Sequence, residues 1–280
     1  MPQTESSVER LPVRGLAGVI RTVWIQRTGA EEHVHRHLPS GGAEILFPLG
    51  GRPQLLGPST RATLEVIPAH TTLVGVRFHP GAAPLLPDGL DALVDQRVYL
   101  TDLRRDLADR LVDEVGRTTT PETALQSLQA QLLNEFRASE HLDPLVHEAV
   151  RALMPWSRTS VDRVATYLSL SPSQLRRRCL QAVGMTPKVL QRTLRFQGFL
   201  ALAQAAARQT GQRAADGLAG LALEAGYADQ AHLARECLRL AGLTPRQLLD
   251  VNADRCAQDH DHSGSYRPFL APQDLALPRV

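Results

Sequence analysis

Two short helical segments carry side chains whose chemistry suits contacts with nucleic-acid bases. In the first, Ser173, Arg176 and Arg177 are spaced i, i+3 and i+4, so they share one side of a helix. An arginine can donate two hydrogen bonds to O6 and N7 of guanine, which is worth about 1–3 kcal/mol of discrimination between bases. Arg178 lies on another side of the same helix and is expected to contact phosphate or solvent.

The second segment displays a similar but less polar set of side chains. Asp229 is placed to cap its helix, and Gln230, Ala231, His232 and Arg235 follow. Alanine can meet a thymine methyl group, arginine a base or a phosphate, and glutamine can position the backbone. We therefore expect this segment to contribute less sequence discrimination than the first. For the first segment the alternative interpretation is that its arginines form only a solvated face.

Both segments lie inside a pattern that occurs twice in the chain. The copies start near Val164 and Leu221, and the second keeps the spacing of the first except for one inserted residue in its turn. Each contains a short helix, a tight turn, a second helix, a glycine stop and a Thr-Pro start for the next helix. This order predicts a helix-turn-helix unit that is present twice.

The two copies are joined by residues 187–208, whose apolar side chains recur close to the helical period. These 22 residues, at roughly 1.5 Å each, predict a helix on the order of 33 Å long. Neighbouring major-groove segments on one face of DNA lie about 34 Å apart. The joining helix therefore has the length to place the two units one turn of DNA apart. Lys188 and Arg192, near its start, are candidates for phosphate contacts.

Charge is distributed unevenly along the chain. Residues 1–141 hold 14 basic and 17 acidic side chains, a net charge of −3. Residues 142–250 hold 14 basic and 8 acidic side chains, a net charge of +6, and residues 251–280 have a net charge of −1. A basic segment that also contains two helix-turn-helix units is expected of a protein that binds duplex DNA.

The front of the chain has the pattern of a β domain. Four β-branched runs separated by Gly and Pro turns predict strands at 18–25, 44–49, 63–67 and 72–78. Short strands at this spacing favour a small sandwich or barrel, which can hold a small ligand if one side is open. Two amphipathic helices follow between residues 101 and 136. They can pack on the β domain, supply a dimer seam, or do both.

The expected fold class is therefore α+β, in two domains. The N-terminal domain is a small β barrel or sandwich with following helices, and the C-terminal domain is all-α. We expect four segments: a β-rich sensor-like domain at 1–100, a helical linker or dimerisation segment at 101–141, the double helix-turn-helix domain at 142–250, and a disordered tail at 251–280.

The basic segment resembles the DNA-binding domain of the AraC/XylS transcription regulators over residues 143–250. The stretches that carry the resemblance are SVDRVATYLSLSPSQLRRR, GMTPKVLQRTLRFQ and LAGLALEAGYADQAHLARECLRLAGLTP. It places Ala231, His232 and Arg235 on the groove side of the second recognition helix. The chain departs from the family at Cys179 and Cys237, where Phe is usual, and at Leu248, where an aromatic residue is common. These changes remove core volume and so bear on stability.

The front half is similar to the N-terminal sensor-like domain of one subgroup of AraC-type regulators. The similar stretches are HRHLPSGGAEILFPLGG, GPSTR, VGVRFHPGAAPLL and VDQRVYLTDL. This resemblance implies a cupin-like fold and a place in a regulator, but it names no effector.

Three alternating histidines offer a different chemistry. His33, His35 and His37 share one face of a strand, as the metal ligands of a cupin would. A glutamate at the usual cupin spacing is missing, because Glu44 lies seven residues beyond His37, so we favour strand histidines without metal. The tail holds a second set of possible soft-metal ligands, for which an unliganded state is favoured: Cys256, Asp259, His260, Asp261 and His262.

These observations predict a cytoplasmic, one-component transcription regulator that inserts two recognition helices into successive major grooves. The chain has no apolar run long enough to span a membrane, no apolar signal core, and no phosphate loop, nucleophile elbow or paired carboxylates. No catalytic residue, metal or cofactor is expected. The expected partners are promoter DNA, a small-molecule effector, a second copy of the chain in a homodimer, and RNA polymerase.

Three questions stay open at this point. Activation and repression are both compatible with the resemblance. A constitutive DNA binder whose N-terminal domain only dimerises is one alternative, and a metal-dependent cupin-type enzyme is another. If there is an effector, we expect it to change how the helices of 101–141 pack against the DNA-binding half.

Overall fold

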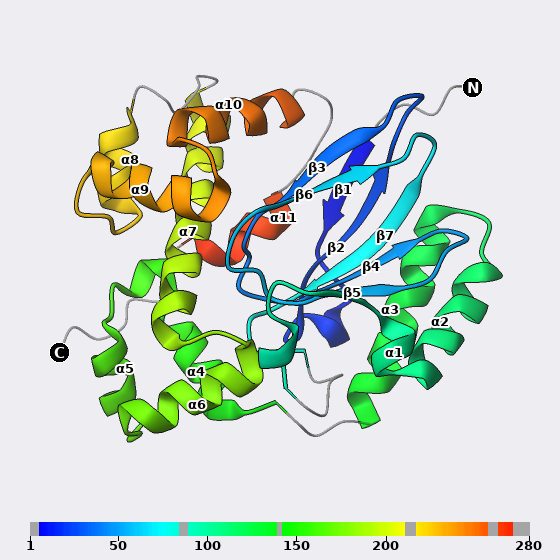
Figure 1. Cartoon of the computed structure of the whole chain (residues 1–280), viewed down its shortest axis with the longest axis horizontal. Coiled ribbons are helices and arrows are strands. Elements are labelled where there is room, and N and C mark those ends of the chain that lie inside the picture. The colour runs from blue at the N-terminus through cyan, green and yellow to red at the C-terminus, as the bar shows by residue number, and fades with distance from the viewer. Residues whose placement is uncertain (1–5, 84–88, 139–141, 211–216, 257–262, 271–280) are drawn as a thin grey trace.

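The computed structural model describes residues 6–83, 89–138, 142–210, 217–256 and 263–270. Its N-terminal part is built on antiparallel strands (Figure 1). Six of them form one sheet, in the order β1 (Ser6–Arg10), β2 (Ile20–Arg27), β7 (Thr72–Phe78), β4 (Glu44–Pro48), β5 (Gln54–Leu56) and β8 (Arg97–Tyr99). Two more, β3 (His33–His37) and β6 (Thr63–Ile67), pair as a separate ribbon.

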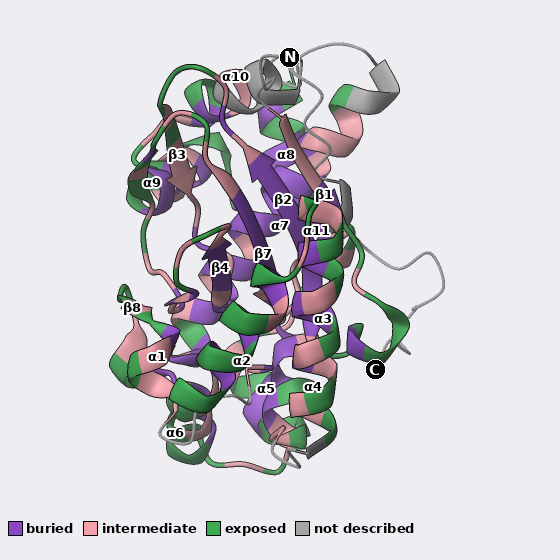
Figure 2. Ribbon diagram, turned by 90° about the vertical axis from the view of Figure 1, so that its right-hand side faces the viewer, coloured by how far each residue is buried: buried purple, intermediate pink, exposed green. Residues whose placement is uncertain are grey.

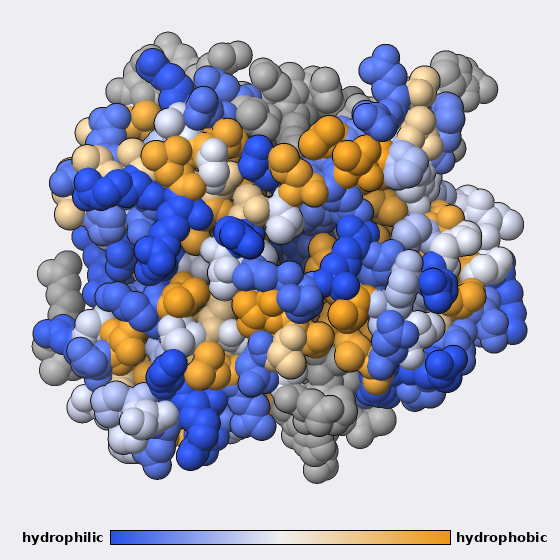
Figure 3. Space-filling view, in the orientation of Figure 1, coloured by the Kyte–Doolittle hydropathy of each residue, from blue (hydrophilic) through white to orange (hydrophobic). Residues whose placement is uncertain are grey.

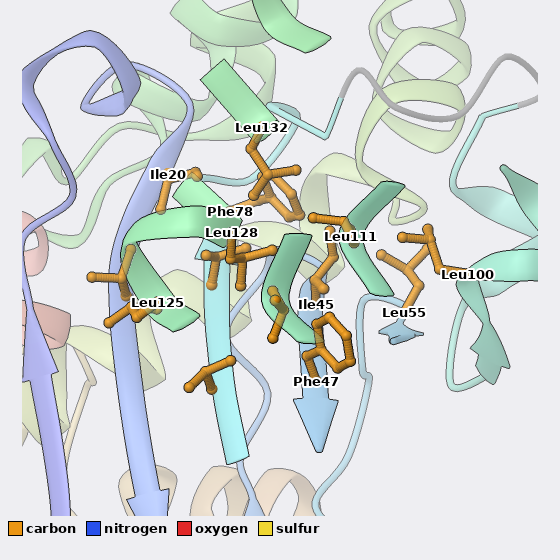
Figure 4. Packing of buried hydrophobic residues seen from close by; sticks show 14 of the residues in the cluster. Ile20, Ile45, Phe47, Leu55, Phe78, Leu100, Leu111, Leu125, Leu128 and Leu132 are labelled. Carbon is orange, nitrogen blue, oxygen red and sulfur yellow. The ribbon is translucent and has the colours of Figure 1, made fainter. Parts of the chain in front are cut away.

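The helices of the front half cover one face of the six-stranded sheet. They are η1 (Arg14–Leu16), η2 (Asp91–Leu93), α1 (Leu100–Leu103), α2 (Arg105–Gly116) and α3 (Pro121–Ala138). Figure 4 shows Leu125, Leu128 and Leu132 of α3 packed over Ile45 and Phe78 of the sheet. The apolar stripes that could have formed a dimer seam are therefore buried inside this chain's own domain.

The other face of the sheet carries the β3–β6 ribbon. Ile67 of β6 packs with Trp24, Leu46 and Leu73 of the large sheet in a small apolar cluster. Arg97 of β8 and Glu65 of β6 form an ion pair at 2.6 Å that also joins the two sheets. The front half is thus a sandwich of two unequal sheets with helices on its outer face.

The C-terminal half is all-α and is organised around one long helix. Its elements are α4 (Pro144–Ala152), η3 (Pro155–Ser157), α5 (Val161–Tyr167), α6 (Pro172–Val183), α7 (Pro187–Thr210), α8 (Leu218–Glu224), α9 (Gln230–Ala241) and α10 (Pro245–Cys256). The first half of α7 packs in a core with α4, α5 and α6, and its middle packs in a second core with α8 and α9. The expected α+β fold of two domains, with two helix-turn-helix units on one long helix, is confirmed.

The two cysteines that replace phenylalanine lie fully buried, one in each of these cores. Cys179 and Cys237 are both free thiols with no exposed surface. Burial raises the pKa of Cys179 to about 11 and that of Cys237 to about 12, with smaller contributions from Asp143 and Glu236. Both groups are therefore unreactive thiols at neutral pH, as expected of core cysteines.

The disordered tail expected at 251–280 is wrong for the part that the structure describes. Helix α10 continues to Cys256, and residues 263–270 form α11 (Ser263–Tyr266) and η5 (Arg267–Phe269). Ser265 and Phe269 are buried, with 5% and 2% of their surface exposed. The polar composition of the tail favoured disorder, but one aromatic side chain reaches a core built from residues far upstream, and no local pattern reveals such a contact. Residues 257–262 and 271–280 lie outside the described part.

The strands β1, β5 and β8 were not predicted either. The latter two are three residues long, so no alternation develops within them. Figure 2 shows that β2 and β7, which pair inside the sheet, are largely buried; β7 has the predicted bounds, and β2 is shifted by two residues from its prediction. Among the described residues no helix is both long and apolar enough to cross a membrane.

Candidate nucleic-acid interface

The first recognition helix, α6, begins at a complete capping box. Ser171 Oγ accepts a hydrogen bond from the Gln174 backbone N–H, and Gln174 Oε1 accepts one from the Ser171 backbone N–H. Leu175, on the inner face, is buried against α4 and α5. The capping box and this buried face fix the rotation of the helix about its axis.

That rotation leaves three of the predicted base-contacting side chains in solvent. Ser173, Arg176 and Arg177 are all exposed. No ion pair involves either arginine within the described part of the chain. Both guanidinium groups therefore face solvent with their donors available for a base or a phosphate.

Arg178 differs from its two neighbours. Its Nη1 lies 2.6 Å from Asp143 Oδ2, and Asp143 Oδ1 accepts hydrogen bonds from the backbone N–H groups of Leu145 and Val146. Arg178 thus links α6 to the N-terminal cap of α4. This pairing competes with the phosphate contact expected for Arg178 from the sequence.

The second recognition helix, α9, starts at Asp229, whose Oδ1 accepts a hydrogen bond from the His232 N–H at 2.6 Å. Gln230, Ala231 and Arg235 are exposed, as the sequence predicts. His232 is half-buried: its ring stacks edge-on against Tyr227 at 5.2 Å, and its Nδ1 accepts a hydrogen bond from Ala228 N–H at 3.4 Å. His232 therefore helps to fix the turn before α9 and presents only part of its ring.

The two phosphate candidates on α7 also differ. Lys188 is exposed at the start of the helix. Arg192 donates two hydrogen bonds to the Glu236 carboxylate of α9, at 2.8 and 2.9 Å, and both side chains are largely buried. Of the cations predicted to contact DNA, Arg178 and Arg192 hold helices together through ion pairs, and the others face solvent.

Sequence reasoning missed one cation that the repeat could have identified. Arg246 occupies in the second copy the position of Lys188 in the first, because it follows Thr244-Pro245 as Lys188 follows Thr186-Pro187. In both helices the threonine hydroxyl caps the first turn, by accepting from Val189 N–H in α7 and from Gln247 N–H in α10. Arg246 is exposed at this equivalent position. It is therefore a further candidate for a phosphate contact.

The front domain touches both recognition helices at their C-terminal ends. Leu90 N–H donates to the Gln181 carbonyl of α6 at 2.9 Å. At α9, Arg36 Nη1 donates to the Ala241 carbonyl at 2.9 Å and Ala62 N–H to the Leu240 carbonyl at 2.7 Å. These contacts lie at the opposite end of each helix from its exposed N-terminal residues. Figure 3 shows hydrophilic side chains gathered on the surface over α9 and over α6.

The three alternating histidines belong to β3. The rings of His33 and His35 are 6.1 Å apart, those of His35 and His37 are 4.4 Å apart, and His37 Nε2 lies 2.6 Å from Glu65 Oε2. Burial raises the pKa of Glu65, but hydrogen bonds from His37 and Arg97 outweigh it, so the pKa lies below its ordinary value. Within the described residues no group of three or more His, Cys, Asp or Glu side chains is arranged to hold a metal ion. The candidate ligands at 256–262 fall outside the described side chains.

Comparisons with known proteins divide the chain in the same way. Residues 8–99 match a family described as "Domain of unknown function (DUF6597)", and residues 164–250 match a family described as "Helix-turn-helix domain". A comparison with curated proteins finds no match.

Among solved structures, the chain is similar to ToxT from Vibrio cholerae. An apo variant of that protein has 11% identity over 81% of this chain and 96% of its own, with a TM-score of 0.45. ToxT bound to (E)-4-(8-methylnaphthalen-1-yl)but-3-enoic acid has 13% identity over 88% and 98%, with a TM-score of 0.42.

Proposed function

We propose that both recognition helices contact bases in successive major grooves of DNA. The premise is that residues 164–250 form an AraC-type helix-turn-helix domain of a DNA-binding transcription regulator. The observation that carries this proposal is the pair of matched, exposed helix starts at α6 and α9. Helix α7 between them has 24 residues, or about 36 Å at 1.5 Å per residue. This length is close to the 34–36 Å that separates neighbouring major-groove segments on one DNA face.

The exposed cations support the same proposal. Arg176 and Arg177 on α6 and Arg235 on α9 face solvent, and Lys188 and Arg246 are exposed at the starts of the two following helices. In this arrangement the arginines of the recognition helices contact base edges, and the two helix starts contact phosphates on either side. The ion pairs of Arg178 and Arg192 hold the units in shape.

The test is selection of random DNA duplexes by the full chain and by three variants. The wild type is expected to enrich two sequence blocks about one helical turn apart. Arg176→Ala and Arg177→Ala are each expected to relax one block while preserving the other, at a loss of about 1–3 kcal/mol for the enriched sequence. Arg178→Ala is the matched control, because it removes a neighbouring arginine that is held by Asp143, and both blocks should persist. Enrichment of no motif by the wild type would leave only non-specific binding and would refute the proposal.

The N-terminal domain is proposed to bind a small-molecule effector between the six-stranded sheet and the β3–β6 ribbon. Trp24 of β2 supports this location, because its indole N–H is buried and has no hydrogen-bond partner within the described part of the chain. The Glu65 carboxylate, held by His37 and Arg97, adds fixed polar groups on the facing ribbon. Aromatic surface with a few polar groups is typical of sites for small organic ligands.

A thermal-shift screen of small organic acids and neutral aromatic compounds tests the effector. An effector is expected to raise the unfolding temperature of the wild type and to change its affinity for the selected duplex, and Trp24→Phe is expected to weaken both effects. Should no compound shift the unfolding temperature, a constitutive DNA binder whose front domain has only a structural role would be the better description.

A further inference from the structure

A short C-terminal segment, residues 263–270, lies between the two halves of the chain. We call it the strap. Its helix α11 contacts β1 and β2 of the front domain and α7 of the DNA-binding half, and η5 contacts α7. Figure 1 shows α11 between the sheet and α7, and Figure 2 shows it beside β1 from a second direction. The strap therefore connects the front domain to α7, two parts of the chain that are far from it in sequence.

On the front domain the strap is held by Ser265. Its Oγ lies 3.2 Å from Thr22 Oγ1, and it accepts a hydrogen bond from Arg77 Nη1 at 3.1 Å. Arg77 is in turn paired with Glu9 of β1 and with Glu44 of the adjacent strand β4. Burial alone would lower the pKa of Arg77, but the two glutamates raise it above its ordinary value, so this group stays charged. Ser265 is thus bonded to a buried ion cluster of the sheet.

On the DNA-binding half the strap is held by Phe269. This side chain is 2% exposed and belongs to the core that contains Leu190 and Leu194 of α7. The guanidinium of Arg21, from the front domain, lies over its ring at 5.2 Å. Tyr266 packs at the edge of both C-terminal cores, where the two helix-turn-helix units meet along α7. The first half of the strap thus contacts both the sheet and α7, and Phe269 in its second half lies between the DNA-binding core and Arg21 of the front domain.

The strap also lies next to the face that carries the proposed effector site. Thr22 and Trp24 are two residues apart on β2, and their partners Arg77 and Gly75 are two residues apart on β7, so all four face the same side of the sheet. The Arg77 guanidinium is 5.7 Å from the Trp24 ring. A ligand that moves Trp24 would therefore move a group that is bonded to the strap.

The closed arrangement that the strap maintains leaves the DNA-contacting side chains free. The front domain touches α6 and α9 at their C-terminal ends, while Ser173, Arg176, Arg177, Gln230 and Arg235 stay exposed. Closure therefore does not cover the proposed DNA surface. Closure holds both recognition helices against the front domain. Their relative motion is therefore already restricted in the free protein, so DNA binding costs less conformational entropy.

We propose that the strap is a positioning device, in which Ser265 and Phe269 hold the front domain against α7 so that both helix-turn-helix units engage DNA together. The DNA readout of this inference rests on the function proposed above. Loss of the strap leaves each unit folded and able to bind by itself. Loss of the strap lowers the extra DNA affinity that comes from binding both units at once, because the arrangement of the two units is then less strictly fixed.

The experiment compares two duplexes bound by full-length variants. One duplex is the two-block sequence selected by the wild type, and the other has its second block scrambled. Phe269→Ala and Ser265→Ala are each expected to weaken binding of the two-block duplex by about fivefold or more and that of the one-block duplex by less than about twofold. Arg267→Ala is the matched control, because Arg267 is an exposed side chain of the same segment, and it should change neither.

A purely structural role for the strap would give a different result. Equal losses on both duplexes, or no loss on either, would overturn the proposal. Each variant is first checked for the wild-type helical circular-dichroism signal, and if Phe269→Ala does not fold, Ser265→Ala and Thr22→Val carry the test. X-ray scattering of the free proteins separates this inference from the proposed function. If the wild type selects no duplex, a larger radius of gyration in the strap variants still supports the strap, and an unchanged radius overturns it.

Discussion

At the scale of single residues, ion pairs decide which predicted cations are available to DNA. Arg176, Arg177 and Arg178 are consecutive, yet among the described residues only Arg178 meets a carboxylate, because it lies on the side of α6 that faces the cap of α4. Arg192 is held in the same way by Glu236 of the second recognition helix. In the free protein, an arginine that is paired with a carboxylate is therefore less available to DNA than one whose guanidinium faces solvent.

Glu236→Gln tests this statement directly. The change removes one negative charge from α9 and loosens Arg192, so we expect tighter non-specific DNA binding and a salt dependence steeper by about one phosphate contact. We also expect a loss of about 1–2 kcal/mol of folding stability, because two charge-assisted hydrogen bonds are weakened. Filter binding between 50 and 200 mM salt measures the first effect and urea unfolding the second. Glu224→Gln, an exposed glutamate on α8, alters the net charge equally and should leave the slope unchanged.

His79 gives a pH dependence of stability. Burial, together with the nearby Arg21, lowers its pKa from the ordinary value of 6.5 to about 4, and its Nε2 lies 3.2 Å from the Ala17 carbonyl. Above pH 6.5 the imidazole of His79 is neutral in both the folded and the unfolded state, so its contribution to the free energy of unfolding is fully present. As the pH falls from 6.5 to 4 the unfolded state takes up the proton first, and stability decreases by about 1–3 kcal/mol.

The measurement for His79 is the urea midpoint at pH 7.5 and pH 4.5. His79→Gln retains a hydrogen-bond donor but does not titrate, so the wild type is expected to lose more stability between the two pH values than the variant does. Carboxylates also titrate in this range, and the comparison with the variant removes their contribution. Identical losses in both proteins would mean that His79 is protonated as easily in the folded chain as in the unfolded one.

At the scale of elements, the repeat provides a matched pair of helix ends. Gly184 ends α6 and Gly242 ends α9, with φ of 75° and 69°, so both adopt the left-handed conformation that favours glycine. A Cβ on Gly184 would lie 2.8 Å from the Leu90 carbonyl oxygen and from Val94 Cγ2 of the front domain. A Cβ on Gly242 would have only Arg36 Nη1 nearby, at 3.9 Å.

We therefore expect Gly242→Ala to cost about 1 kcal/mol, which is the strain of a left-handed alanine. Gly184→Ala is expected to cost about 2–4 kcal/mol, because it also displaces the loop whose Leu90 N–H bonds to α6. Thermal and urea unfolding of the two variants measure the difference. An equal loss of unfolding free energy in the two variants would show that the front domain moves away from Gly184 without loss of stability.

Elements with a local signal could be predicted from the sequence, and contacts between distant segments could not. The duplicated pattern predicted α5, α6, α8, α9 and α7, because caps, glycine stops and apolar periods are all local. The capping box at Ser171 and the exposure of Arg176 follow from the same signals. The pairing of Arg178 with Asp143, and of Arg192 with Glu236, depends on how helices cross, and the ordered strap depends on one buried Phe269. None of these leaves a trace in a window of a few residues.

At the scale of the whole molecule, the DNA-binding half and the front domain form one closed body. The Gln197 side chain of α7 donates to the Pro39 carbonyl at 2.6 Å, and a Cβ on Gly41 would touch Leu190 and Leu194 of α7. The front domain thus meets α7 and both recognition helices, and the strap contacts the sheet and α7 as well. DNA binding by this body has to be accounted for by the cations that remain on its surface.

The salt dependence of DNA binding measures how many of those cations contact phosphate. Five cations of the proposed interface are exposed: Arg176, Arg177, Lys188, Arg235 and Arg246. Each neutralised phosphate contributes about −0.9 to the slope of log K against log salt on duplex DNA, so Lys188 and Arg246, the two cations proposed to contact phosphates, are expected to give a slope of about −2. Fluorescence anisotropy with the selected duplex from 50 to 200 mM salt provides the value, and Lys188→Ala and Arg246→Ala should each reduce its magnitude by about one. A wild-type slope of about −4 or steeper would show that Arg178 and Arg192 leave their carboxylates when DNA binds, and that the ion pairs of the free protein are exchanged for phosphate contacts.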